Sequence, residues 1–315
     1  MEVKNNVLKI GERKFKISSL VILAETAVII GLGIALASTS SKLKADEEYI
    51  AVEAQKVYEY YDSGDYVSFN DYTYGDVILK AVDGMPRCTY DYSNLETDGC
   101  KKYYSENGEV ISKLGVDVSY FQGDIDWEAV KADGIDFVMI RAGYRGYETG
   151  LVNTDSRFEE YISGALAADL EVGVYFYSQA VNADEAEEEA EYVVSLLEPY
   201  DVTYPVVYDW EIVGEESART NEVTAAELTE CSAKFCSVIS KAGYKPMIYT
   251  NKRQALLKTD LNVLGGIDHW IAEYTDTPSF PYEFQMWQYA SDAVVDGIEG
   301  DVDINLSFVD YTSVR

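Results

Sequence analysis

The stretch YPVVYDWE, residues 204–211, runs from a β-type apolar segment into two carboxylates, Asp209 and Glu211. A near-continuous run of valine and tyrosine is typical of a strand that is buried on both faces of a parallel sheet. Side chains alternate along a strand, so Asp209 and Glu211 lie on one face and Trp210 lies on the other. A buried strand that ends in two negative charges on one face indicates a functional site.

From Leu114 onward, apolar segments typical of strands alternate with segments typical of amphipathic helices. Strands are predicted at GVDVSY, FVMIRAG, EVGVYFYS, YPVVYDWE, KPMIYTN, HWIAEY, FQMWQYA and VDINLS. Helices are predicted over residues 126–134, 155–170, 182–199 and 224–243, and mostly loops join the later strands. This alternation predicts a parallel sheet covered by helices. Eight strands favour an irregular α/β barrel of the TIM type whose last part lacks full helices, and an open doubly wound sheet is the alternative.

Acidic residues gather where these strands end. Asp117 ends the first strand, Asp209 and Glu211 end the fourth, and Asp303 lies in the last. In a parallel barrel the chemistry lies at the carboxyl ends of the strands. Carboxylates that share a low-dielectric mouth raise one pKa and leave another low, so that an acid and a base coexist near neutral pH. Glycoside hydrolysis uses such a pair.

Aromatic residues also fall at the strand ends. Their rings could stack on the faces of sugars, which makes them candidate substrate-binding residues, and packing in the core is the alternative for each of them. They are Tyr175, Tyr177, Tyr249, Trp270, Tyr274, Trp287 and Tyr289.

The composition argues against several classes of protein. The chain has 25 Lys and Arg against 56 Asp and Glu, a net charge of −31, which argues against binding of nucleic acid or anionic lipid. It has one histidine, His269, on which any Ser-His-Asp machinery would depend. The sequence holds no HExxH, no zinc-ligand cluster, no dinucleotide-binding glycine motif and no P-loop. We therefore expect no metal and no cofactor.

The beginning of the chain has the pattern of an export segment. A basic flank, residues 1–16, precedes the apolar run Ile17–Ala37, which only Glu25 interrupts. A run of about 20 residues can span a bilayer, and the positive flank then stays in the cytoplasm. The pattern predicts a membrane anchor, with a signal peptide cleaved after Ala37 as the alternative. In either case the rest of the chain lies outside the membrane.

Residues 38–113 are acidic and rich in tyrosine, and we expect an extracytoplasmic stalk or small accessory domain before a barrel of residues 114–315. Cys88 and Cys100 flank a short polar segment there, and a disulfide between them is permitted outside the cytoplasm. Cys231 and Cys236 lie in a predicted helix. Five residues rise about 7.5 Å along a helix, too far for a disulfide, so these two are predicted to be buried thiols.

Seven segments in order resemble glycoside hydrolase family 25, the Chalaropsis-type lysozymes or N-acetylmuramidases. They are GVDVSYFQGDIDW, FVMIRAGY, GVYFYS, YPVVYDWE, AGYKPMIYTN, HWIAEY and MWQYAS…GDVDINLS, within about residues 114–307. The resemblance implies an irregular barrel of five α/β units followed by three strands. It also implies hydrolysis of the β-1,4 bond between N-acetylmuramic acid and N-acetylglucosamine in peptidoglycan. It says nothing about residues 1–110.

The same resemblance implies roles for the acidic residues. Glu211 matches the proton donor, and Asp209 and Asp117 match the family's other acidic positions. Asp303 matches the acidic residue of the V-D-x-N motif, although Asp296 and Asp301 are close by. One departure concerns residues 141–144, which read Arg-Ala-Gly-Tyr where many members carry K-x-[ST]-E-G.

The sequence allows two forms of the mechanism. Glu211 protonates the glycosidic oxygen and then activates water as a carboxylate. In one form Asp209 orients or stabilises the 2-acetamido group of the substrate, which acts as an internal nucleophile. In the other form Asp209 or Asp117 attacks the anomeric carbon directly.

Two other classes compete with this interpretation. A catalytically silent barrel that only binds glycan would be expected to lack the acid, yet Glu211 is present. A metal-dependent hydrolase would use Asp117, Asp209 and Asp303 as hard oxygen ligands. In the favoured interpretation the partner is the peptidoglycan strand and the protein is a monomer.

Fractionation of cells that express the full chain tests the anchor. We expect the protein in the membrane fraction with an intact N-terminus, because Ile17–Ala37 would stay in the bilayer. N-terminal sequencing of the mature protein is the measurement. A released product that begins near Ser38 would contradict the anchor and support cleavage.

Overall fold

The computed structural model describes residues 2–4, 7–10, 13–16, 20–22 and 65–314. The chain divides into two compact units, Met1–Gly84 and Met85–Arg315, which are described separately.

The first unit contains two small sheets. Strands β1 (Glu2–Lys4), β2 (Val7–Ile10) and β3 (Arg13–Lys16) pair antiparallel, and β6 (Gly75–Lys80) pairs with β5 (Tyr66–Asp71) and β4 (Leu20–Ile22). An Asp71 side-chain oxygen closes the β5–β6 turn by accepting hydrogen bonds from the backbone N–H groups of Thr73 and Tyr74 at 2.8 and 3.0 Å.

The predicted anchor, Ile17–Ala37, lies outside the described residues except for the strand Leu20–Ile22. Among the residues that the structure does describe, no helix has both the length and the apolar character needed to cross a membrane.

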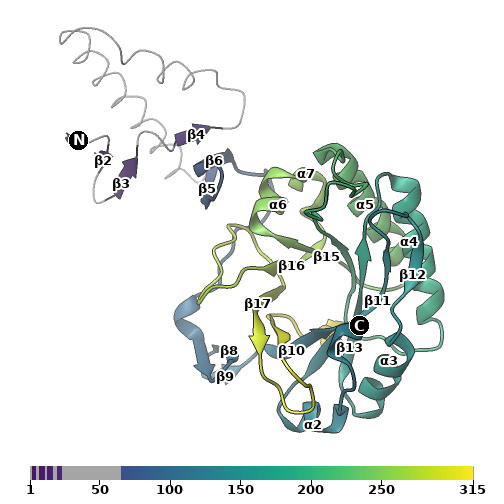
Figure 1. Cartoon of the computed structure of the whole chain (residues 1–315). Coiled ribbons are helices and arrows are strands. Elements are labelled where there is room, and N and C mark those ends of the chain that lie inside the picture. The colour runs from purple at the N-terminus through teal and green to yellow at the C-terminus, as the bar shows by residue number, and fades with distance from the viewer. Residues whose placement is uncertain (1, 5–6, 11–12, 17–19, 23–64, 315) are drawn as a thin grey trace. The chain divides into compact units, whose positions relative to one another are not determined.

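The second unit is built on a closed barrel of eight strands (Figure 1). In chain order these are β10 (Lys113–Val118), β11 (Phe137–Arg145), β13 (Glu171–Ser178), β14 (Val206–Trp210), β15 (Pro246–Asn251), β16 (Asp268–Ala272), β17 (Met286–Ala293) and β18 (Val302–Ser307). Neighbours from β10 to β17 pair in parallel. Strand β18 closes the ring by pairing antiparallel with both β17 and β10. The predicted strands and the barrel are confirmed, and the open sheet is wrong because β10 has a neighbour on each side.

Helices cover the outside of the first part of the barrel (Figure 1). They are α2 (Trp127–Ala132), α3 (Phe158–Ala167), α4 (Ala183–Leu197) and α5 (Ala225–Lys241), followed after β15 by the short α6 (Lys252–Leu257) and α7 (Leu261–Leu264). Residues 273–285 and 294–301 join the last strands without a helix. The order of five strand–helix units and then three strands agrees with the expectation.

The barrel interior is filled by alternate residues of the strands. Its core cluster includes Phe137, Met139, Val207, Met247 and Met286. Gly115 makes room for this packing, because a Cβ atom there would lie 2.3 Å from the ring of Phe137. The lower part of the barrel is therefore a packed core, and polar chemistry is left to the opposite end.

Residues 85–112 pack with the barrel, although the sequence placed them in the accessory region. They include β7 (Leu95–Asp98), β8 (Lys101–Glu106) and β9 (Glu109–Val110). The ring of Tyr90 stacks on that of Phe308 with centroids 4.1 Å apart, and Tyr90 donates a 2.7 Å hydrogen bond to the carbonyl of Phe284. The division between the two units therefore falls at Gly84, because these aromatic contacts bind the segment to the barrel.

The cysteines differ in part from the prediction. All four are free, so the disulfide predicted between Cys88 and Cys100 is wrong for this structure. The Cys88 Sγ atom lies 3.0 Å from Tyr92 Oη, whereas Cys100 Sγ lies 3.6 Å from the carbonyl oxygen of Val294. Cys231 and Cys236 are buried in α5 as predicted.

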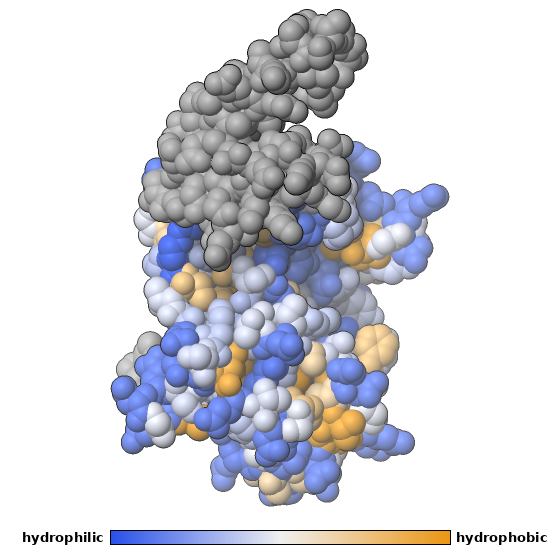
Figure 2. Space-filling model, turned by 90° about the vertical axis from the view of Figure 1, so that its left-hand side faces the viewer, coloured by the Kyte–Doolittle hydropathy of each residue, from blue (hydrophilic) through white to orange (hydrophobic). Residues whose placement is uncertain are grey.

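The outer surface agrees with the acidic composition. On the face seen in Figure 2, hydrophilic residues cover most of the coloured surface and hydrophobic residues form small separate patches. A surface of this kind keeps its charged side chains hydrated.

Candidate active site

A cleft of about 300 Å³ lies at the carboxyl ends of the barrel strands. All four predicted carboxylates, Asp117, Asp209, Glu211 and Asp303, line it. Five of the predicted aromatic residues line it as well, namely Tyr175, Tyr177, Tyr249, Trp270 and Tyr274. Asp296 and Asp301 do not line the cleft, which leaves Asp303 as the acidic residue of its segment that does.

Strand register explains this grouping. Asp117 of β10 pairs directly with Asp303 of β18, and Asp209 of β14 lies between Tyr177 and Tyr249 of the neighbouring strands. Trp210 points to the opposite face, where its indole N–H donates to the carbonyl of Ala180 at 3.3 Å. The predicted alternation of Asp209, Trp210 and Glu211 is therefore present.

Trp287 and Tyr289 are outside the cleft, contrary to the prediction that they bind substrate. Met286 of the same strand belongs to the barrel core and Gln288 lines the cleft, so the alternation of β17 turns Trp287 and Tyr289 outward. The indole N–H of Trp287 donates to the carbonyl of Glu273 at 2.8 Å. The hydroxyl of Tyr289 donates to the carbonyl of Cys100 at 3.1 Å. The prediction rested on their position at the end of a strand. Their side chains lie on the face of β17 that points away from the cleft.

Two buried amides hold the Asp117 carboxyl. Gln288 Nε2 and Asn305 Nδ2 each donate to Asp117 Oδ2 at 2.8 Å. Neither amide was predicted from the sequence as a site residue. The signal was present, because Asn305 lies two residues after Asp303 on β18 and Gln288 lies two residues after the core residue Met286.

Aromatic side chains fix the orientation of both amides. Trp270 Nε1 donates to Asn305 Oδ1 at 2.8 Å. The hydroxyls of Tyr249 and Tyr274 donate to Gln288 Oε1 at 2.8 and 2.9 Å. An indole N–H can only donate, so the amide oxygen of Asn305 faces it and the NH₂ group faces Asp117. These aromatic rings therefore have a polar function in the site as well as a packing function.

Burial dominates the acidity of Asp117 and Asp303. Burial, and then the charge of Asp303, raise the pKa of Asp117 to about 8, although the amides of Asn305 and Gln288 favour the ionised form. Burial raises the pKa of Asp303 to about 6. The two carboxyls thus lose their protons at a higher pH than exposed aspartates do.

Asp209 and Glu211 form a coupled pair. Burial, followed by the charges of Glu211 and Asp117, raises the pKa of Asp209 well above its ordinary value. Burial also raises the pKa of Glu211, and a hydrogen bond with Asp209 opposes that rise. Both carboxyls therefore keep their protons to a higher pH than exposed carboxyls do. Among the described residues, the buried Oδ1 atom of Asp209 has no hydrogen-bond partner.

The backbone that carries Glu211 is fastened by two glutamines. Gln179 Nε2 donates to the carbonyl of Glu211 at 3.0 Å, and Gln254 Nε2 donates to the carbonyl of Trp210 at 2.7 Å. Thr220 Oγ1 donates to Gln179 Oε1 at 2.9 Å, which fixes the orientation of that amide. Consecutive carbonyls are thus held where β14 ends and the loop begins.

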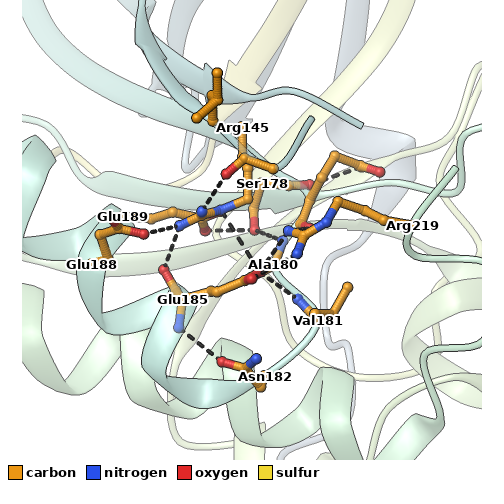
Figure 3. A network of polar contacts seen from close by, with 12 residues as sticks. Arg145, Ser178, Ala180, Val181, Asn182, Glu185, Glu188, Glu189 and Arg219 are labelled. Atoms are coloured by element: carbon orange, nitrogen blue, oxygen red, sulfur yellow. Dashed lines mark hydrogen bonds and ion pairs between the residues drawn. The ribbon is translucent and has the colours of Figure 1, made fainter. Parts of the chain in front are cut away.

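Ion pairs secure the loop that follows Glu211 (Figure 3). Arg219 of this loop donates two hydrogen bonds of 2.6 Å to the carboxylate of Glu185 on α4. Arg145 of β11 in turn donates to Glu189 of α4 at 2.6 Å. A bidentate arginine–carboxylate pair is geometrically specific, so the loop has a defined place against α4.

Among the described parts of the chain, no group of three or more His, Cys, Asp or Glu side chains is arranged to hold a metal ion. His269 is buried, and burial lowers its pKa to about 4. It does not line the cleft.

The family of the chain follows from its match to a family sequence model. The sequence model of glycosyl hydrolases family 25 matches residues 116–298, which is more than half of the chain. The chain belongs to glycosyl hydrolases family 25. The match includes the strands that carry Asp117, Asp209 and Glu211 and ends before Asp303.

Two curated relatives of this family 25 chain are lysozymes. The autolytic lysozyme of Clostridium acetobutylicum is 27% identical over 193 residues, which cover 61% of this chain and 54% of that protein. Lysozyme M1 of Streptomyces globisporus is 27% identical over 202 residues, which cover 61% of this chain and 66% of that protein. The family 25 chain thus spans about half to two thirds of the length of these relatives.

Solved structures share the fold. The modular autolysin LytC of Streptococcus pneumoniae has a TM-score of 0.54 and 24% identity, and the match covers 77% of this chain and 56% of that one. A family 25 glycosyl hydrolase of Bacillus anthracis has a TM-score of 0.53 and 19% identity, with 68% of this chain and 96% of that one covered. At these identities the likeness shows the family 25 barrel alone.

The raised pKa of Asp117 predicts a pH-dependent loss of stability. A folded-state pKa of about 8 against an ordinary 3.8 means that folding opposes ionisation, so stability present at low pH is lost as the pH rises between these values. Asp117→Asn cannot ionise. Compared with the wild type, we expect the variant to be more stable at pH 8 relative to pH 4, because only the wild type must ionise a buried carboxyl as the pH rises. Thermal unfolding at both pH values measures this, and an equal difference at both would contradict it.

The Gln179 contact predicts a positioning effect on Glu211. Gln179→Leu leaves the carbonyl of Glu211 without its donor, and the loss of this hydrogen bond should cost about 0.5–1.5 kcal/mol in unfolding free energy. Any hydrolysis that depends on Glu211 should also slow. Gln285→Leu is the matched control, because Gln285 likewise bonds a backbone group, the N–H of His269 at 2.9 Å, away from the cleft. Unfolding and turnover are measured for both variants. Equal turnover in the two would show that the Gln179 contact serves stability alone.

Proposed function

We propose that the chain is a lysozyme-type muramidase, which hydrolyses the β-1,4 bond between N-acetylmuramic acid and N-acetylglucosamine in peptidoglycan. The observation that carries the proposal is that Asp209 and Glu211 line one cleft together with Asp117 and Asp303, where burial raises the pKa of both carboxyls. Membership of family 25 and the lysozymes among its relatives support the same substrate. A neutral carboxylic acid near neutral pH is the reagent that protonates a glycosidic oxygen.

Glu211 is the general acid in this proposal. It follows the last residue of β14 and lines the cleft, so a glycan oxygen that enters the cleft can reach it. Its raised pKa keeps the carboxyl protonated to a higher pH than an exposed glutamate would be. After the leaving group departs, the Glu211 carboxylate accepts a proton from the incoming water.

Asp209 acts on the 2-acetamido group. Its unpartnered Oδ1 atom is a buried acceptor in the cleft, and an amide N–H of the substrate would satisfy it. Such a contact orients the acetamido carbonyl toward the anomeric carbon, so the unpartnered atom favours the substrate-assisted form over direct attack by Asp209.

Asp117 and Asp303 complete the acidic mouth. Gln288 and Asn305 fix the Asp117 carboxyl, so this polar group has a constant place in the cleft beside the bound sugar. Asp303 is its partner across the strand pair and couples to its ionisation. Tyr175, Tyr177, Tyr249 and Trp270 form the wall and floor against which the sugars lie.

We further propose that the protein acts outside the cytoplasm as a monomer. The basic residues 1–16 and the apolar run Ile17–Ala37 support an anchor with its N-terminus in the cytoplasm. The acidic surface supports a polymeric, uncharged sugar backbone as partner rather than nucleic acid.

Glu211→Gln tests the proposal most directly. The substitution keeps size and polarity but removes the transferable proton, so cleavage should fall by about 10²–10⁴-fold. The measurement is the release of soluble fragments from purified peptidoglycan, with mass spectrometry to show N-acetylmuramic acid at the new reducing end. Digestion with EDTA present tests the metal-dependent class in the same assay.

Glu191→Gln is the matched control, because Glu191 is exposed on α4 away from the cleft. It should cleave at the wild-type rate. If folded Glu211→Gln also cleaves at that rate, the acid has been assigned to the wrong residue.

A further inference from the structure

An exposed aromatic ring stands at the rim of the cleft beyond the carboxylates. Phe121 lines the cleft and is 71% exposed. It follows Asp117 in the loop after β10, in the short 3₁₀ helix Tyr120–Gln122. A single exposed apolar ring is common on protein surfaces, but this one is part of the cleft.

The ring of Phe121 rests on a rigid stack. Its centroid lies 4.1 Å from that of Tyr120. The Arg141 guanidinium carbon lies 5.1 Å from the centre of the Tyr120 ring and 5.5 Å from that of Phe121. Arg141 is itself fixed, because its Nε donates to the buried Asp155 at 2.8 Å. Cation–π contacts of this kind hold both rings in place before any ligand arrives.

The backbone beneath the two rings is equally constrained. Ser119 N–H donates to Gln122 Oε1 at 2.9 Å, and Tyr120 N–H donates to Asp155 Oδ2 at 3.2 Å. Tyr161 donates a hydrogen bond to the carbonyl of Gly123, where the φ angle is +66°. These contacts hold the backbone that carries the two rings in one conformation.

We propose that Tyr120 and Phe121 form a sugar-stacking subsite, which receives the apolar face of an amino-sugar ring distant from the cleaved bond. The inference rests on the proposed function, since it assigns a part of the same glycan to this rim. The C–H groups on one face of a pyranose carry partial positive charge, and the face of an aromatic ring is negative. Because the rings are already ordered, binding loses little side-chain entropy.

The subsite gives Arg141 a positioning role. Its charge is paired with Asp155, so it supports the two rings and does not serve as the main anion receptor of the cleft. An arginine suits this role, because a planar guanidinium stacks on aromatic rings and a lysine ammonium does not.

Kinetics on glycan oligomers of increasing length test the subsite. The substrates alternate N-acetylglucosamine and N-acetylmuramic acid. Phe121→Ala in the full chain should raise KM about tenfold for the longer oligomers, with kcat unchanged, because one stacking contact is lost. Short oligomers that do not reach the rim should be unaffected, and Phe121→Trp should retain the wild-type KM. A KM that does not respond to Phe121→Ala at any length would overturn the proposal.

Fluorescence gives a readout that does not depend on cleavage. The four native tryptophans are all buried, so Phe121→Trp adds a single exposed indole. In a Glu211→Gln background, long oligomers should shift its emission to shorter wavelength in a saturable way. Tyr147→Trp in the same background is the matched control, because Tyr147 is 39% exposed and does not line the cleft.

The outcomes separate the subsite from the proposed function. An unchanged Phe121→Trp spectrum at millimolar oligomer, or an equal shift in Tyr147→Trp, would overturn the subsite. A specific Phe121→Trp shift in a chain whose wild type cleaves no oligomer would support the subsite and refute the muramidase.

Discussion

Closure of the barrel is the constraint on which the rest of the structure depends. Strand β18 runs antiparallel between β17 and β10 and satisfies the backbone groups that an open sheet would leave at two edges. The same pairing places Asp303 beside Asp117 and Asn305 beside Gln288. Strand β18 thus completes both the barrel and the group of carboxylates. The site requires that the first and last strands of the barrel, β10 and β18, pair with each other.

The site then has to hold negative charge in a poorly solvated place. Four carboxyls line one cleft, and burial raises the pKa of every one of them. Only Asp117 has a full set of amide donors, and these depend on the orientation of Trp270, Tyr249 and Tyr274. The buried carboxyls therefore lower the local stability of the fold. Such a loss is common at sites whose groups exchange protons near neutral pH.

Rigidity around the cleft comes from polar contacts outside it. Gln179 and Gln254 hold the end of β14, and the Arg219–Glu185 pair fastens the following loop to α4. On the other side of the mouth, Asp155 holds Arg141, which supports Tyr120 and Phe121. The cleft is therefore shaped in part by residues such as Gln254, Glu185 and Asp155 that do not line it, and preorganisation of this kind lowers the entropic cost of binding.

The sequence by itself determined the strand order, the five strand–helix units and the four carboxylates, because these follow from short-range periodicity and from where apolar runs end. It could not determine contacts between distant segments. Trp287 and Tyr289 turn outward because β17 alternates about its core residue Met286, and residues 85–112 join the barrel because Tyr90 meets Phe308. Tertiary contacts also separate the two cysteines: the Sγ atom of Cys88 lies beside Tyr92, and that of Cys100 lies beside Val294. Only the tertiary structure brought Gln288, Asn305 and Gln179 to the site, because an amide becomes functional through the partner that fixes its orientation.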